Sequence, residues 1–108
     1  MLKWMRGQPV YMGGKPVYKD ASGTPKTSPI AIDTNIIEIV PPAGAVFCYL
    51  RPRNVDLRIG NDAAHTNGYM IVEAASWSPA ITVTNGDSIY VSADSGTDSL
   101  NVMFEVLQ

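Results

Sequence analysis

Apolar and polar residues alternate with a period of two along most of the chain after residue 30. The pattern is clearest at 55–59 and 100–106, where every second residue is Val, Leu, Ile or Phe. Successive side chains of a strand point to opposite faces, so this pattern places one apolar face against a core. About seven or eight short strands are expected, among them 34–40, 45–50, 55–59, 69–73, 80–84, 88–92 and 100–107, and no segment of useful length shows a helical period. The apolar run at 45–50 predicts a strand that is buried on both faces.

Turn signals separate these segments. Two prolines and a glycine lie at 41–44, and a polar loop is predicted at 60–68. The Asn85-Gly86 pair between two alternating runs predicts a hairpin, because a tight primed turn needs positive φ angles. Short strands about ten residues apart predict an all-β fold, an antiparallel β-sandwich that is either jelly-roll-like or Ig-like.

The first 29 residues differ from the rest in charge and composition. Residues 1–29 carry five basic residues and one acid, a net charge of +4, whereas residues 30–108 carry three arginines and nine acids, a net charge of −6. We therefore expect an extended, basic N-terminal arm and linker at 1–29, followed by a β-sandwich domain at 30–108. About 80 residues form a small core, and small domains gain stability from oligomers or larger partners.

The arm contains an internal repeat. Gly-Gln-Pro-Val-Tyr at 7–11 is followed seven residues later by Gly-Lys-Pro-Val-Tyr at 14–18. Proline favours extended backbone, so both copies are expected to be extended. They form either a hairpin about residues 12–14 on the protein's own body or two anchors on a partner. The candidate partner-binding residues of the arm are Trp4, Arg6, Val10, Tyr11, Lys15, Val17 and Tyr18.

The residue pattern contains no recognisable catalytic motif. The single cysteine, Cys48, lies in an apolar run and is expected to be a buried thiol. The single histidine, His65, is expected to be a solvated loop residue. Asp94 and Asp98 flank a glycine, which fits a turn better than a Ca²⁺ site. We therefore predict a protein that is not an enzyme and has no catalytic residues, metal or cofactor.

Membranes and nucleic acids are not expected partners. No apolar run approaches the ~20 residues that span a bilayer, and the N-terminus lacks a signal-peptide pattern. The chain is therefore expected to be made in a cytoplasm. Its basic residues are few and the net charge is −2, whereas nucleic-acid binding domains carry a denser basic patch.

Residues 55–106 resemble small β-sandwich virion proteins of tailed bacteriophages. The resemblance rests on Val-Asp-Leu-Arg-Ile-Gly at 55–60, Asn-Gly at 67–68, Trp77 before a strand, Gly-Asp-Ser-Ile-Tyr-Val at 86–91 and a Ser-Gly-Thr turn before the last strand. It implies a capsid decoration (cement) protein in the virion, a homo-oligomer (dimer or trimer) that binds the major capsid protein or another virion protein and stabilises the shell. The alternatives are a tail or baseplate accessory subunit and a carbohydrate-binding module for host attachment, in which Trp77 stacks on sugars together with Tyr69 or Tyr90.

Overall fold

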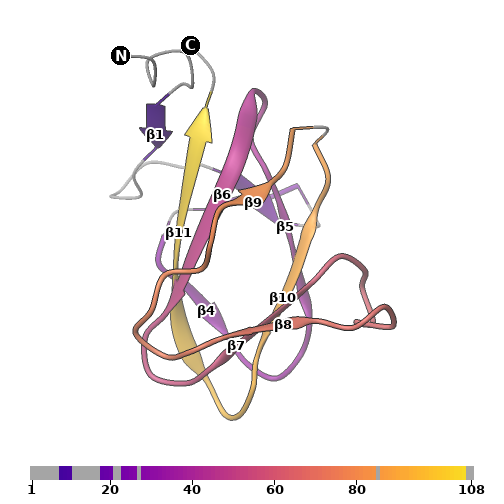
Figure 1. Ribbon diagram of the computed structural model, residues 1–108, viewed down its shortest axis with the longest axis vertical. Helices are drawn as coiled ribbons and strands as arrows, with labels where there is room; N and C mark the ends of the chain where they lie inside the picture. Colours follow the sequence, from indigo (N-terminus) through magenta and orange to yellow (C-terminus); the bar gives the residue numbers. More distant parts are fainter. Residues whose placement is uncertain (1–7, 11–17, 21–22, 27, 85, 107–108) are drawn as a thin grey trace.

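The computed structural model describes residues 8–10, 18–20, 23–26, 28–84 and 86–106, all as strands, turns and loops (Figure 1). The strands are β1 (Gln8–Val10), β2 (Tyr18–Asp20), β3 (Pro25–Lys26), β4 (Ile30–Ile32), β5 (Ile37–Val40), β6 (Ala45–Pro52), β7 (Leu57–Gly60), β8 (Met70–Val72), β9 (Ile81–Thr82), β10 (Ile89–Ala93) and β11 (Asp98–Val106). Within these ranges no helix is long and apolar enough to cross a membrane.

Strands β4–β11 form an antiparallel jelly roll. The first of these strands pairs with the last, β4 with β11, and the same rule gives the pairs β5–β10, β6–β9 and β7–β8. The segment therefore behaves as one long hairpin that is rolled into two sheets, with strand orders β4-β11-β6-β9 and β5-β10-β7-β8. The predicted β-sandwich is confirmed, and of its two alternatives the strand order is that of a jelly roll and not of an Ig domain.

The N-terminal strands extend both sheets. Strand β1 pairs with the second half of β11, beyond the part that β4 occupies. Strand β2 pairs with β5 and with β3 in the other sheet. Between β1 and β4, the Ser28 hydroxyl accepts the Val102 N–H (2.9 Å), so a side chain replaces a strand at this point of the β11 edge. Strands from the segment predicted as an arm thus join the sandwich of their own chain. Strands β1 and β2, which carry parts of the two repeat copies, lie in different sheets and do not pair with each other as a hairpin.

The core lies between the two sheets. On β11 the side chains of Leu100, Val102 and Phe104 are fully buried, as the alternating pattern predicts. The other buried apolar residues are Ile32, Ile39, Ala45, Cys48, Leu50, Leu57, Ile59, Val72, Val83, Ile89, Val91 and Ala93. The predicted burial of Cys48 is confirmed, and burial raises the pKa of its thiol far above the usual value. A thiol held neutral in this way is a poor nucleophile.

The segment 45–50 is not buried on both faces. Cys48 and Leu50 point into the core, whereas Phe47 and Tyr49 on the opposite face are only partly buried. The register with β11 shifts between Glu105 and Val106, so the alternation is interrupted near the start of β6. The apolar run suggested a doubly covered strand because three of its outward residues are themselves apolar.

The expected hairpin at Asn85-Gly86 is also wrong. Gly86 has a φ of 76°, as the turn requires, and its N–H donates to the Val83 carbonyl (3.0 Å). The flanking strands β9 and β10 nevertheless lie in different sheets. Strand β9 ends at Thr82 and β10 begins at Ile89, and the residues between them form a connection that is long enough to pass from one sheet to the other. The turn residues were recognised correctly, but turn chemistry does not say which strands pair.

Candidate functional site

The β7–β8 connection, residues 61–69, is a loop with its own internal hydrogen bonds. The Asp62 carboxylate accepts the N–H groups of Thr66 (2.8 Å) and Asn67 (3.4 Å). The backbone adds bonds from His65 N–H to the Asp62 carbonyl and from Gly68 N–H to the His65 carbonyl. The bond from Thr66 lowers the pKa of Asp62 against the opposing effect of desolvation. Asp62 therefore holds the loop by these hydrogen bonds in its ionised form.

His65 fastens this loop to the sheet. Its Nε2 lies 3.0 Å from the carbonyl oxygen of Tyr90 on β10, so this nitrogen carries the proton and donates it. The ring packs against Gly60, where a Cβ atom would lie 2.4 Å from His65 Cδ2. His65 lies in the loop as expected, but its ring is partly buried and bonded to the sheet, so the expectation of a solvated side chain is wrong. The local sequence is that of a polar loop, and the Tyr90 carbonyl that holds the ring is 25 residues away.

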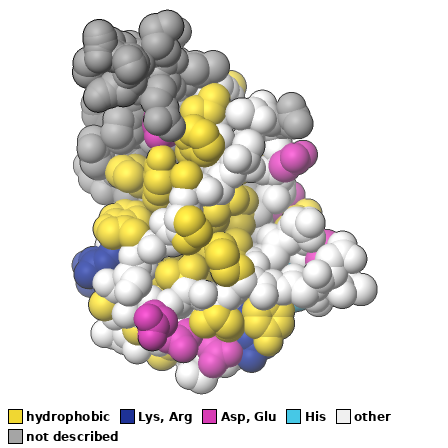
Figure 2. Space-filling model, viewed as in Figure 1, with side chains coloured by type: hydrophobic (Ala, Val, Ile, Leu, Met, Phe, Trp, Pro, Cys, Tyr) yellow, Lys and Arg dark blue, Asp and Glu magenta, His cyan; other side chains and the backbone are white. Residues whose placement is uncertain are grey.

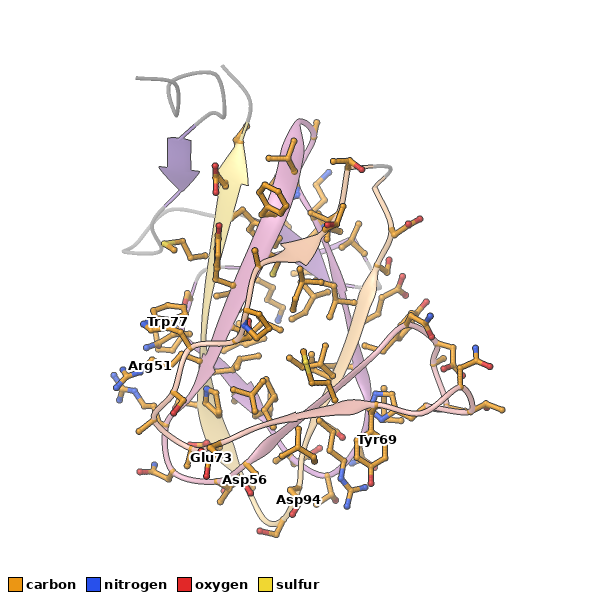
Figure 3. The ribbon with its side chains drawn as sticks, in the orientation of Figure 1. Arg51, Asp56, Tyr69, Glu73, Trp77 and Asp94 are labelled. Carbon is orange, nitrogen blue, oxygen red and sulfur yellow. The ribbon has the colours of Figure 1, made fainter. Side chains whose placement is uncertain are left out.

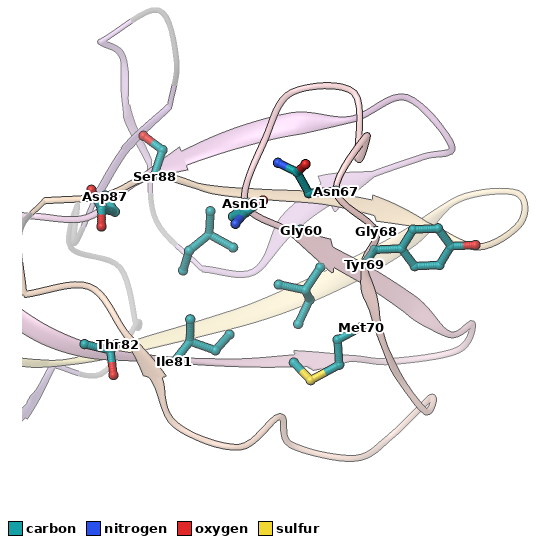
Figure 4. Close-up of a pocket in the computed structure, with 12 residues that line it drawn as sticks. Gly60, Asn61, Asn67, Gly68, Tyr69, Met70, Ile81, Thr82, Asp87 and Ser88 are labelled. Atoms are coloured by element: carbon teal, nitrogen blue, oxygen red, sulfur yellow. The ribbon is translucent and has the colours of Figure 1, made fainter.

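Tyr69 is held on the outer face of the six-stranded sheet. The Arg58 guanidinium lies 4.9 Å from the centre of the Tyr69 ring, and Arg58 Nε donates to Asp94 Oδ1 (2.8 Å). The His65 ring lies 5.4 Å from the Tyr69 ring, centre to centre. Together these contacts orient Tyr69 along the sheet, and Figure 4 shows its ring pointing away from the neighbouring groove.

A groove of about 520 Å³ opens between the two sheets beside this loop (Figure 4). Its walls come from the end of β7, the loop before β8, the short strand β9 and the start of β10. Its apolar lining is Ile59, Met70, Ile81 and Ile89, and its polar lining is Asn61, Asn67, Thr82, Asp87 and Ser88, together with Gly60, Gly68 and the base of Tyr69. Figure 2 shows apolar side chains exposed in the middle of this face. Sequence reasoning missed this site, because its residues were interpreted one loop at a time.

The edge strand β8 carries exposed apolar side chains. Met70 and Ile71 lie on it and Tyr69 precedes it, and each is more than one-third exposed. Among the described residues no strand pairs with the outer edge of β8. We call Tyr69, Met70 and Ile71 the β8 edge surface. An uncovered apolar edge of this kind is a candidate surface for contact with another chain.

Trp77 lies apart from Tyr69, one of the two tyrosines with which a sugar-stacking site was considered. It is 48% exposed in the β8–β9 connection, where the nearby Ala75 carbonyl accepts a bond from Arg51 Nε (3.2 Å). Figure 3 places Trp77 beside Arg51 and Tyr69 on the opposite side of the molecule. Trp77 and Tyr69 therefore do not form one platform.

Asp94 and Asp98 both make hydrogen bonds that hold the fold. Asp94 lies in the bend before β11, as the turn interpretation predicts, whereas Asp98 is the first residue of β11. Asp98 is 8% exposed and accepts the N–H groups of Arg53, Asn54, Val55 and Ser99 at 2.8–3.0 Å. Asp94 bonds Arg58 as described above. Within the described ranges, no three His, Cys, Asp or Glu side chains gather as a metal site would require.

Five of the predicted partner-binding residues lie outside the described residues: Trp4, Arg6, Tyr11, Lys15 and Val17. The other two are at strand positions, Val10 opposite Phe104 and Tyr18 opposite Lys26. The partner-binding role of all seven residues stays a prediction.

The described chain is thus an all-β protein of jelly-roll topology with a groove and an apolar edge at its β7–β8 end. Comparison with protein-family models, with curated proteins and with solved structures finds no match.

Replacing Gly60 by Ala is expected to lower the free energy of unfolding by about 1–3 kcal/mol, because the new methyl group displaces the His65 ring. His65→Ala alone is expected to cost about 1 kcal/mol through the lost bond to Tyr90. Urea unfolding of both single variants and the double variant measures the coupling. Since the clash needs the ring, Gly60→Ala should cost clearly less in the His65→Ala background. Equal costs in the two backgrounds would show that the ring does not pack on Gly60.

Proposed function

We propose that this chain is a non-enzymatic structural protein of a virion, a capsid decoration or cement protein that binds the outer shell and stabilises it. Its partner is the major capsid protein or another virion protein. It acts as a homo-oligomer, a dimer or a trimer, so that many weak contacts repeated over a symmetric shell give avidity.

The observation that carries the proposal is the β8 edge surface. Ile71 is 45% exposed on the outer face of the sheet, next to Tyr69, and both lie at an edge that no described strand covers. Soluble monomers usually protect such edges with charges or prolines, and β8 has neither. An uncovered apolar edge fits a subunit that docks on a larger assembly.

The topology and the charge distribution support the same role. Jelly rolls are frequent in viral capsid proteins, although they also occur in lectins and other proteins, so this support is by analogy of fold. The basic residues of 1–29 and the acidic residues of 30–108 give one chain two segments of opposite net charge. Charges of this kind orient a subunit on a complementary surface.

Binding to particles tests the proposal. Ile71→Lys places a charge in the β8 edge surface without touching the core and is expected to lower occupancy on tailed-phage particles that lack this protein by at least tenfold. Ser95→Lys, on the exposed bend before β11, is the matched control and is expected to bind normally. Co-sedimentation measures occupancy, and thermal unfolding verifies that both variants are folded. Unchanged occupancy of Ile71→Lys would show that β8 is not the docking edge. Absence of binding by the wild-type protein would overturn the virion role.

The tail or baseplate alternative predicts the same contacts at another place on the particle. Electron microscopy of particles decorated with the wild-type protein separates the two, because shell binding follows the icosahedral lattice and tail binding does not.

A further inference from the structure

The groove between the sheets combines an apolar floor with a polar rim. Ile59 and Ile89 are almost fully buried at its base, and Ile81 and Met70 border it from the two sheet edges. Its volume of about 520 Å³ lies within the range of small-molecule sites. Sites of that class place a small number of polar groups around an apolar surface.

The polar rim is not used by the fold. The side chains of Asn61, Asn67, Thr82, Asp87 and Ser88 make no hydrogen bond to any other described residue. The opposite end of the sandwich differs: there Asp98 and Asp56 accept backbone N–H groups from neighbouring loops. Two amides, two hydroxyls and a carboxylate thus surround one groove with free donors and acceptors.

The charge of the rim restricts which kinds of ligand can bind in the groove. Asp87 is the only ionisable side chain in the lining that is charged at neutral pH, and no lysine or arginine lines the groove. A carboxylate accepts hydrogen bonds from hydroxyl groups but repels an anion. The groove therefore suits a neutral ligand that is rich in hydroxyl groups and disfavours phosphates and other anions.

The rim is also held in place before any ligand binds. The Asp62 bonds to Thr66 and Asn67 and the His65 bond to Tyr90 fix the loop that carries Asn61 and Asn67. A site that is already ordered loses less conformational entropy on binding.

We infer that this groove binds a neutral sugar, with the C–H face of a ring on Ile81, Ile89 and Met70 and its hydroxyl groups on Asn61, Asn67 and Asp87. The bound ring makes no stack on Tyr69 or Trp77, because the first points away from the groove and the second lies on another side. The groove shares Tyr69 and Met70 with the β8 edge surface but not Ile71, so Ile71→Lys tests the virion proposal and the Asn61 and Asp87 variants test this inference separately.

The inference is tested by nuclear magnetic resonance titration of the full chain with neutral disaccharides. The set includes disaccharides of gluco, galacto and manno configuration and disaccharides of N-acetylated sugars. We expect weak binding, with shifts in the amide signals of Gly60, Gly68 and Ser88. The double variant Asn61→Ala with Asp87→Ala is expected to lower the affinity at least tenfold. Trp77→Ala and Ser95→Lys are matched controls that should bind as the wild type does.

A galacturonic acid disaccharide tests the charge argument. It is expected to bind several-fold more weakly than its neutral counterpart, and Asp87→Asn should reduce this difference. Absence of shifts with every neutral disaccharide would overturn the inference. Shifts that map to Trp77 and vanish in Trp77→Ala, or groove binding of an extended apolar peptide instead of any sugar, would overturn it as well.

Discussion

Replacing Asp98 by Ala is expected to lower the free energy of unfolding by about 3 kcal/mol or more, the value of several hydrogen bonds to one buried charged group. The carboxylate accepts four backbone N–H groups and the Asn54 side-chain amide, and these bonds tie the β6–β7 connection to the start of β11. Removing it leaves several donors without a partner where water has little access. Urea unfolding of the purified variant at neutral pH measures the loss.

Asp94→Ala, in the connection between β10 and β11, is the matched control. Its carboxylate is 41% exposed and bonds only the half-exposed Arg58 among the described residues, so the expected cost is below about 1 kcal/mol. Equal losses for the two variants would show that Asp98 is not the anchor of this end of the sandwich.

The same carboxylate predicts an acid-sensitive fold. Desolvation raises the pKa of Asp98, but the bonds from Val55, Asn54, Ser99 and Arg53 together outweigh it, so the pKa lies below that of an unperturbed aspartate. A folded-state pKa below the unfolded one gives stability that is present above the unfolded pKa and is lost as the pH falls through the folded value. Wild-type stability should therefore fall below about pH 4. Asp98→Asn should show a smaller fall over the same range, and parallel curves would contradict this origin of the acid sensitivity.

Phe104→Ala is expected to cost about 3–5 kcal/mol, which places the variant near the limit of folding for a domain of this size. Phe104 is the largest fully buried side chain of the described core, and it lies at the centre of the sheet between β1 and β6. Its removal leaves a cavity that the flanking strands cannot close, because their hydrogen bonds hold the register. Thermal and urea unfolding measure the effect.

Asn101→Ala on the same strand is the control, because the alternating pattern of β11 places this side chain on the outer face. Asn101 lies on the outer face of the sheet opposite Arg51, and its replacement is expected to change the stability by about 0.5 kcal/mol or less. A large loss for Asn101→Ala would mean that the outward face of β11 is covered in solution.

Local patterns predicted the strands and their inward faces well. Leu57, Ile59, Leu100, Val102 and Phe104 are buried as their spacing requires. The limits of the elements were less accurate, since β11 begins at Asp98 inside the expected turn, and β4 was not expected. Asp98 joins the strand because β4 pairs with it, a contact between residues 66 positions apart that no local pattern contains.

At the candidate site too, local features could be predicted from the sequence, whereas contacts between distant residues could not. Glycine and asparagine at 60–68 indicated a polar loop, and the turn role of Asp94 was expected. The sequence did not indicate that His65 reaches the Tyr90 carbonyl, or that Asn61 and Asp87 border one groove. Each of these relations joins a loop residue to a residue of another loop or strand that is distant in the sequence.

By itself, the sequence determined the type of this protein: an all-β sandwich with one apolar face per strand, a buried thiol and a charge that changes sign after residue 29. These properties follow from side-chain alternation and composition, which act over a few residues. Only the tertiary structure decided that the strands roll up as β4–β11, β5–β10, β6–β9 and β7–β8, which carboxylate anchors the loops and where the groove opens. Pairing depends on which distant strands bury their apolar faces together, and turn residues such as Asn85 and Gly86 suit a hairpin and a sheet crossing equally well.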